Sequence, residues 1–148
     1  MISQLLIGSL IIAVTTILHA AFIGAGIAGL TRFGERLTAA PSYFMKTTML
    51  VAATLWLLAS HSVGVWFWAF IFNLLGAING LEPAVYFSLV TFTTLGYGDI
   101  TLNESWRILS ALCAANGLLL FGFSTAFLVE LMRRLQQEPK EADENHAS

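Results

Sequence analysis

Long runs of apolar residues, separated by short polar breaks, dominate the chain. Three runs are long enough to cross a bilayer, which takes about 20 apolar residues in a helix, and they occupy residues 2–30, 47–75 and 106–135. A fourth run, 83–94, is too short to span and leads into glycines, which indicates a re-entrant helix and loop. The pattern predicts an all-α membrane protein with three transmembrane helices and one re-entrant helix.

The polar breaks divide the chain into four parts. We expect an N-terminal transmembrane helix at 1–30, a cytoplasmic linker at 31–46, a unit of two spans with the re-entrant segment at 47–135, and a cytoplasmic tail at 136–148. The tail is predicted to be disordered because it is polar and acidic with almost no apolar residue. It is also too short to form a ligand-sensing domain.

Composition agrees with a membrane protein. The chain is 57% hydrophobic and 11% charged, whereas soluble domains average about 45–50% apolar and about 25% charged residues. The absence of a basic stripe argues against a nucleic-acid partner. The single cysteine, Cys113, cannot form an intrachain disulfide and is expected to be a buried, inert thiol.

Basic residues predict the orientation in the cell membrane. Most of them lie in the first polar break or after the third span, and basic residues favour the cytoplasm. The N-terminus and the re-entrant segment are therefore expected outside, with the C-terminus in the cytoplasm. This places Trp66, Trp68 and Trp106 near the outer interface, where aromatic side chains gather. The basic residues assigned to the cytoplasmic side are Arg32, Arg36, Lys46, Arg133, Arg134 and Lys140, and Arg107 falls on the other side.

A short motif follows the re-entrant helix. An ion that crosses a membrane loses its water and needs substitute oxygens, which rings of backbone carbonyls supply. Glycines at alternate positions let the backbone turn successive carbonyls to one side at no steric cost. The partly negative C-terminal end of the preceding helix favours a cation nearby. The motif is Thr94-Leu95-Gly96-Tyr97-Gly98-Asp99, in which the Tyr97 ring is expected to point away from the ion path.

The stretch 91–99 resembles the signature of the potassium channel family, whose common core is Thr-Val-Gly-Tyr-Gly-Asp, with Leu95 in place of the valine. The resemblance covers 47–135 and implies an outer helix, a pore helix, a selectivity filter and an inner helix, with a homotetramer around a central pore. Tyr97 argues against the nonselective relatives, which carry an acid at that place. The implied ion-binding residues are Thr94, Leu95, Gly96, Tyr97 and Gly98, with K⁺ at the first four.

The same resemblance assigns roles along the inner helix. It implies a hinge at Gly117 and a set of pore-facing side chains, whose spacing of three and four keeps them on one helix face. Phe121 is then a candidate for a hydrophobic constriction that gates the pore by dewetting. The alternative is that this face packs against neighbouring helices. The implied pore-facing residues are Leu118, Phe121, Thr125 and Val129.

One position departs from the family pattern. Many relatives carry a glutamate on the pore helix that hydrogen-bonds the aspartate after the filter, and this chain has Val90 there. Asp99 therefore needs another partner. Tyr86 matches an aromatic position that fills this role in relatives, so we hypothesise a hydrogen bond from Tyr86 to Asp99 that supports the filter.

Two histidines lie within predicted spans. His19 in the first span and His61 in the second are expected at a similar depth, since the two helices run antiparallel. One interpretation is a proton-sensing pair, because ionisable residues inside a membrane are candidates for function. The other is a pair of neutral histidines bonded to hydroxyls such as Ser60, Ser62 or Thr16.

Further polar residues also have two interpretations each. Asn116, before the implied hinge, either tunes block by intracellular cations or hydrogen-bonds between helices. Glu130 either pairs within its helix with Arg133 and Arg134 or forms a ring that concentrates cations. Three acidic residues, Glu82, Asp99 and Glu104, are expected to attract cations to the outer mouth.

The first span is additional to the simplest two-helix channels. We expect it at the periphery, with a neighbouring subunit as one possible packing partner. Its small residues Gly24, Gly26 and Gly29 predict close helix packing, and the alternative is that they only weaken the helix end.

These features predict a potassium-selective channel subunit that conducts K⁺ passively. No catalytic constellation, nucleotide-binding fingerprint or arginine ladder occurs, so we expect neither an enzyme, nor a bound cofactor, nor a voltage sensor. Two other classes stay open, a subunit of a potassium transporter and a non-conducting subunit that modifies another channel. The intact motif and the single loop argue against the transporter.

Overall fold

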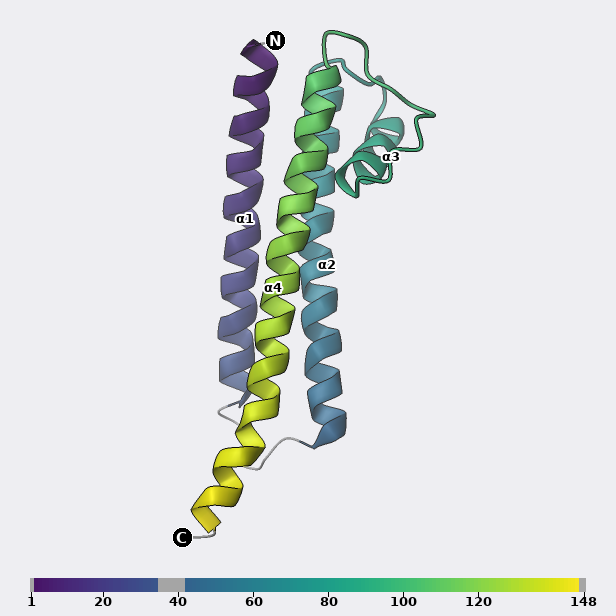
Figure 1. Ribbon diagram of the computed structural model, residues 1–148. Helices are drawn as coiled ribbons and strands as arrows, with labels where there is room; N and C mark the ends of the chain where they lie inside the picture. Colours follow the sequence, from purple (N-terminus) through teal and green to yellow (C-terminus); the bar gives the residue numbers. More distant parts are fainter. Residues whose placement is uncertain (1, 35–41, 147–148) are drawn as a thin grey trace.

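The computed structural model describes residues 2–34 and 42–146 (Figure 1). Every regular element in these residues is a helix, and three of the helices are long and apolar enough to cross a membrane. This confirms the predicted all-α membrane protein. The helices are α1 (Ile2–Gly34), α2 (Tyr43–Leu74), α3 (Leu81–Phe92) and α4 (Arg107–His146).

The three long helices lie side by side, and the short helix α3 lies against one end of α2 (Figure 1). Helices α1 and α4 run in the same direction and α2 runs in the opposite direction, so the N-terminus lies at the α3 end of the bundle and the C-terminus at the other end. Helix α3 and the loop after it therefore both lie at the end of the bundle where α2 ends and α4 begins, as the re-entrant interpretation requires.

Helix boundaries differ from the predicted division at both polar breaks. Helix α1 continues to Gly34 and α2 begins at Tyr43, where the Ser42 hydroxyl caps the helix by accepting from the Met45 amide at 3.4 Å. The rest of the predicted linker, 35–41, lies outside the described residues. At the other end α4 continues to His146, beyond residue 136, where the predicted tail begins. Glutamine, glutamate, lysine and alanine, which fill most of this stretch, all favour helix.

The hydrophobic core lies where α2, α3 and α4 meet. Trp68 and Phe72 from α2 and Phe92 from the end of α3 are fully buried there. The burial of Trp68 corrects the prediction that it belongs to an interfacial belt, whereas Trp66, two residues earlier in α2, is 54% exposed. Cys113 is buried in the same cluster as a free thiol, as expected for an inert side chain.

Glycines allow close helix contacts, although mostly not those that we predicted. Of the three glycines named in α1, only Gly26 has a neighbour, the Trp56 ring, and no atom lies within 4 Å of a Cβ built on Gly24 or Gly29. The tightest contact at a glycine of α1 is instead at Gly8, where an added Cβ would overlap with Leu112 of α4. Helix α1 therefore packs against α4 and α2 of its own chain.

Asn116 connects the three long helices. Its Oδ1 accepts from the Thr15 hydroxyl of α1 at 2.8 Å and from the Trp68 indole N–H of α2 at 2.9 Å. Its side chain is fully buried, so the interhelical interpretation is the one that the structure supports. The Trp68 N–H can only donate, which fixes Oδ1 as the atom between the two partners.

We expect Asn116→Leu to lower the free energy of unfolding by about 1–3 kcal/mol, the range for leaving a buried donor unpaired. The substitution keeps the side-chain shape but removes the acceptor of the Trp68 N–H. Thermal unfolding of the purified protein in detergent measures the change. Asn79→Leu, at an exposed position between α2 and α3, is the matched control and should leave stability unchanged. Equal stability of both variants would contradict this role of Asn116.

Candidate functional site

The backbone after α3 folds back onto the C-terminal end of that helix. The Thr94 amide donates to the Thr91 carbonyl at 2.9 Å, and the Leu95 and Gly96 amides both donate to the Val90 carbonyl, at 3.0 and 3.1 Å. These bonds satisfy carbonyls that the end of a helix otherwise leaves without a partner. They also fix the loop so that its N–H groups face α3.

The loop alternates in backbone conformation. Thr94, Gly96 and Gly98 have φ values of 61°, 56° and 78°, in the left-handed region, and the two residues between them are not among those with positive φ. Such alternation collects successive N–H groups on one side of the chain and leaves the carbonyls on the other. Glycine adopts this conformation freely, but Thr94 is held in it at some steric cost. The alternating glycines were predicted, and the third left-handed residue, Thr94, was not.

The carbonyl oxygens of 94–97 accept no hydrogen bond from any residue that the structure describes. They lie beside the C-terminal end of α3, which carries partial negative charge. A row of carbonyls in this setting can coordinate a cation that has lost its water. Cation binding by the loop stays a prediction.

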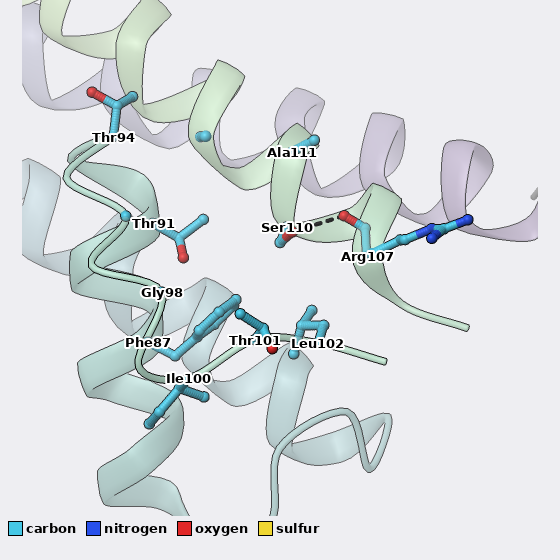
Figure 2. A pocket seen from close by; sticks show the side chains of 12 residues that line it. Phe87, Thr91, Thr94, Gly98, Ile100, Thr101, Leu102, Arg107, Ser110 and Ala111 are labelled. Carbon is cyan, nitrogen blue, oxygen red and sulfur yellow. Dashed lines mark hydrogen bonds between the residues drawn. The ribbon is translucent and has the colours of Figure 1, made fainter. Parts of the chain in front are cut away.

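The loop borders a cavity of about 460 Å³. Figure 2 shows the loop and α3 on one side of this cavity and the first turns of α4 on the other. Leu95 and Tyr97 are 55% and 68% exposed, so the described part of the chain leaves more than half of each uncovered. The predicted orientation of the Tyr97 ring, away from the ion path, therefore stays a prediction. The cavity is lined by Phe87, Thr91, Thr94, Gly96, Gly98, Ile100, Thr101, Leu102, Arg107, Ser110, Ala111 and Ala114.

A hydrogen bond joins α3 to the end of the loop. The Tyr86 hydroxyl donates to Asp99 Oδ2 at 2.6 Å, which confirms the predicted contact between these two residues. Val90, at the position where relatives carry a glutamate, is buried. The hydrogen bond from Tyr86 lowers the pKa of Asp99 below its usual value, and the same bond raises the pKa of Tyr86.

We expect Tyr86→Phe to raise the pKa of Asp99 back toward its ordinary value. The pKa of Asp99 is depressed in the folded chain. The stability that the contact contributes is therefore fully present above the ordinary carboxyl pKa, and it is lost as pH falls through the lower pKa of the folded chain. NMR titration of the labelled Asp99 carboxyl measures the shift. Tyr43→Phe, at a tyrosine that is 88% exposed, should leave Asp99 unchanged. An unaltered titration in Tyr86→Phe would show that the contact has no electrostatic effect.

The implied pore-facing residues lie on one face of α4. Leu118 and Val129 are 64% and 58% exposed, Thr125 is exposed, and the packed face of the helix carries Asn116 and Ser124. An uncovered apolar face agrees with pore lining and equally with packing on a neighbouring chain, so both interpretations stay open. Phe121 is more restrained than the others, because its ring stacks on His61 with the centroids 4.1 Å apart.

Gly117 has a role that the sequence did not reveal. A Cβ at this position would overlap with the Phe92 carbonyl oxygen and would lie 2.7 Å from the Phe92 carbonyl carbon. The absence of a side chain therefore allows α4 to touch the end of α3 directly below the loop. A hinge at Gly117 stays a prediction. Gly122, where an added Cβ would have nothing within 4 Å, is a second flexible point that we did not single out.

The two histidines lie together, as predicted, with ring centroids 5.0 Å apart. His19 Nδ1 is 2.8 Å from the Ser60 hydroxyl, and the Nε2 atoms of both histidines lie within 3.2 Å of the Ser124 hydroxyl. This arrangement fits neutral histidines bonded to hydroxyls, although Ser62 donates to its own helix instead. Proton sensing stays an untested alternative. The residue that we missed was Ser124, which lies eight residues after Asn116 in α4 and which nothing in the sequence distinguishes from its neighbour Thr125.

Glu130 pairs within its own helix. Its carboxylate accepts from the Arg133 and Arg134 Nε atoms at 2.9 and 2.8 Å, which confirms the expected intrahelical pairing. Of the acids assigned to the outer mouth, Glu104 lies 3.6 Å from Arg107, and both side chains are largely exposed.

Comparison with known proteins identifies a family. A family model described as Ion channel matches residues 48–134, which is more than half of the chain and takes in α3, the loop and most of α2. Helix α1 lies outside the matched region. No curated protein and no solved structure matches the chain.

Proposed function

Because the chain belongs to the ion channel family through residues 48–134, we propose that it is the subunit of a potassium-selective channel that conducts K⁺ passively. The observation that carries this proposal is the alternating backbone of the loop of 94–98, in which the amides of residues 94–96 donate to α3 and the carbonyls of 94–97 are left free. Carbonyl rings of this kind replace the hydration shell of K⁺ in potassium channels. The proposed K⁺ ligands are the carbonyls of Thr94, Leu95, Gly96, Tyr97 and Gly98.

The proposed assembly is a homotetramer. One loop offers carbonyls to only one side of an ion, so a closed ring needs further copies around an axis. The uncovered side chains of Leu95 and Tyr97, and the cavity behind the loop, supply surfaces for neighbouring copies to cover. In this assembly the exposed face of α4 with Leu118 and Phe121 lines the pore, and the Tyr86–Asp99 bond braces the filter.

In the proposed orientation the loop faces the outside of the cell and the end of α4 faces the cytoplasm. The excess of basic residues after the third span and in the first polar break supports it. Conduction needs neither a reaction nor a bound cofactor, because K⁺ passes down its own gradient. A transporter subunit and a regulatory subunit of another channel remain the alternatives.

Flux from liposomes separates these possibilities. The purified chain, reconstituted alone and loaded with K⁺, should release K⁺ rapidly when a proton carrier supplies the counter-ion flow, and liposomes loaded with Na⁺ should not release Na⁺. Single-channel currents in a bilayer distinguish a channel from a carrier by their turnover. Absence of any K⁺ flux from the correctly folded protein would favour the regulatory subunit and would contradict the proposal.

A further inference from the structure

Three positions of α4 carry hydrogen bonds to other helices. The Ile108 amide donates to Gln4 Oε1 of α1 at 3.1 Å, Asn116 joins α1 and α2, and Ser124 joins the same two helices further along. Ile108 and Asn116 precede Gly117, and Ser124 follows it. Among the described side chains of α4 beyond Gly117, Ser124 is the only one that hydrogen-bonds to another helix.

The Ser124 hydroxyl lies between the two buried histidine rings. It lies 2.9 Å from His61 Nε2 and 3.2 Å from His19 Nε2, and all three side chains are at least nine-tenths buried. A serine hydroxyl has one proton, so it donates to one Nε2 and accepts from the N–H of the other. The Ser60 hydroxyl lies 2.8 Å from His19 Nδ1 and orients the His19 ring. One hydroxyl thus fastens α4 to α1 and α2 together.

The segment of α4 that Ser124 fastens lies after two weak points of the helix. Gly117 and Gly122 both precede Ser124, and glycine is the least favourable residue in a helix interior apart from proline. Beyond Ser124 the contacts to α2 are apolar, with Leu131 and Leu135 packed near Ala53. Apolar contacts are non-directional and permit sliding. The directional contact in this half of α4 is the one at Ser124.

We propose that the Ser124 hydroxyl, held by His19 and His61, is a latch that keeps the half of α4 beyond Gly117 away from the pore axis. This inference rests on the proposed function. Helices α1 and α2 occupy the packed side of α4, so a released segment can move only toward its exposed side, where Leu118 and Val129 lie. That movement narrows the pore. The same histidine also stacks on Phe121, so release frees the candidate constriction as well.

The decisive variant is Ser124→Ala, recorded as single channels in a bilayer. The variant loses both bonds of the Ser124 hydroxyl, so we expect its open probability to fall by at least about fivefold, which is the factor for one hydrogen bond of average strength. Unitary conductance and the preference for K⁺ over Na⁺ should stay unchanged because the loop of 94–98 is not touched. Ser62→Ala is the matched control, since the Ser62 hydroxyl donates only to the Leu58 carbonyl of its own helix. His19→Ala removes one of the two bonds and should cause a fall no larger than that of Ser124→Ala, and adding it to Ser124→Ala should cause no further fall.

A second measurement does not depend on conduction. Spin labels at Met132, which is 43% exposed on α4, report the distance between neighbouring copies of the chain. The latch predicts a shorter distance in Ser124→Ala than in the wild type. If the wild type did not pass K⁺, the proposed function would be wrong, but the distance between the spin labels could still be compared between the wild type and Ser124→Ala. An unchanged or longer distance, or an open probability that stays level or rises, would overturn the latch.

Discussion

Replacing Gly117 with alanine should destabilise the folded chain by about 3 kcal/mol, the upper end of the usual cost of overpacking a core. The added Cβ would overlap with the Phe92 carbonyl group, which is backbone at the end of α3 and cannot rotate away as a side chain can. Either α4 must move away from α3 or the loop above Phe92 must shift. Thermal unfolding in detergent and the yield of assembled protein measure the effect.

Gly122→Ala is the matched control for this prediction. It places the same methyl group in the same helix, where nothing lies within 4 Å. Alanine is about 1 kcal/mol more favourable than glycine in a helix interior, so this variant should be as stable as the wild type or more stable. If Gly117→Ala were equally well tolerated, the close approach of α4 to the end of α3 would not be a requirement of the fold.

Gly96→Ala should abolish selective K⁺ flux while leaving most of the fold intact. The residue has φ 56°, and an L-residue with a Cβ in the left-handed region costs about 1–2 kcal/mol. That cost is modest for stability, but any relaxation turns the neighbouring carbonyl out of the row that is proposed to hold K⁺. We expect a loss of at least about a hundredfold in K⁺ flux, which corresponds to roughly 3 kcal/mol.

The connection between α2 and α3 offers a control with the same backbone strain. Gly76 has φ 65°, and an added Cβ there would have nothing within 4 Å. Gly76→Ala should therefore lose a similar amount of stability and keep its K⁺ flux and selectivity. A parallel loss of flux in both variants would indicate general destabilisation rather than a specific role of the loop.

The sequence predicted the features that depend on local physics. Apolar length alone located the three spans and the re-entrant helix, and the alternating glycines predicted the left-handed positions at Gly96 and Gly98. The contact of Tyr86 with Asp99 was also predicted, because α3 and the loop are close in sequence and a helix turn sets their relative position.

Features that depend on how distant helices approach one another were not predictable in this way. Trp68 looked like an interfacial residue, but its N–H meets Asn116 in the core. Gly117 drew attention as a hinge, whereas its contact with the Phe92 backbone arises only when α4 packs on α3. Ser124 carries no sequence signal of its own until both histidines are seen to converge on it.

The reversal potential of single channels tests the central claim most directly. The purified chain is placed in a planar bilayer with KCl on one side and an equal concentration of NaCl on the other. Carbonyl coordination by the loop of 94–98 predicts a large reversal potential of the sign set by the K⁺ gradient, together with block by Ba²⁺. A reversal potential near zero, which means equal passage of K⁺ and Na⁺, would contradict potassium selectivity.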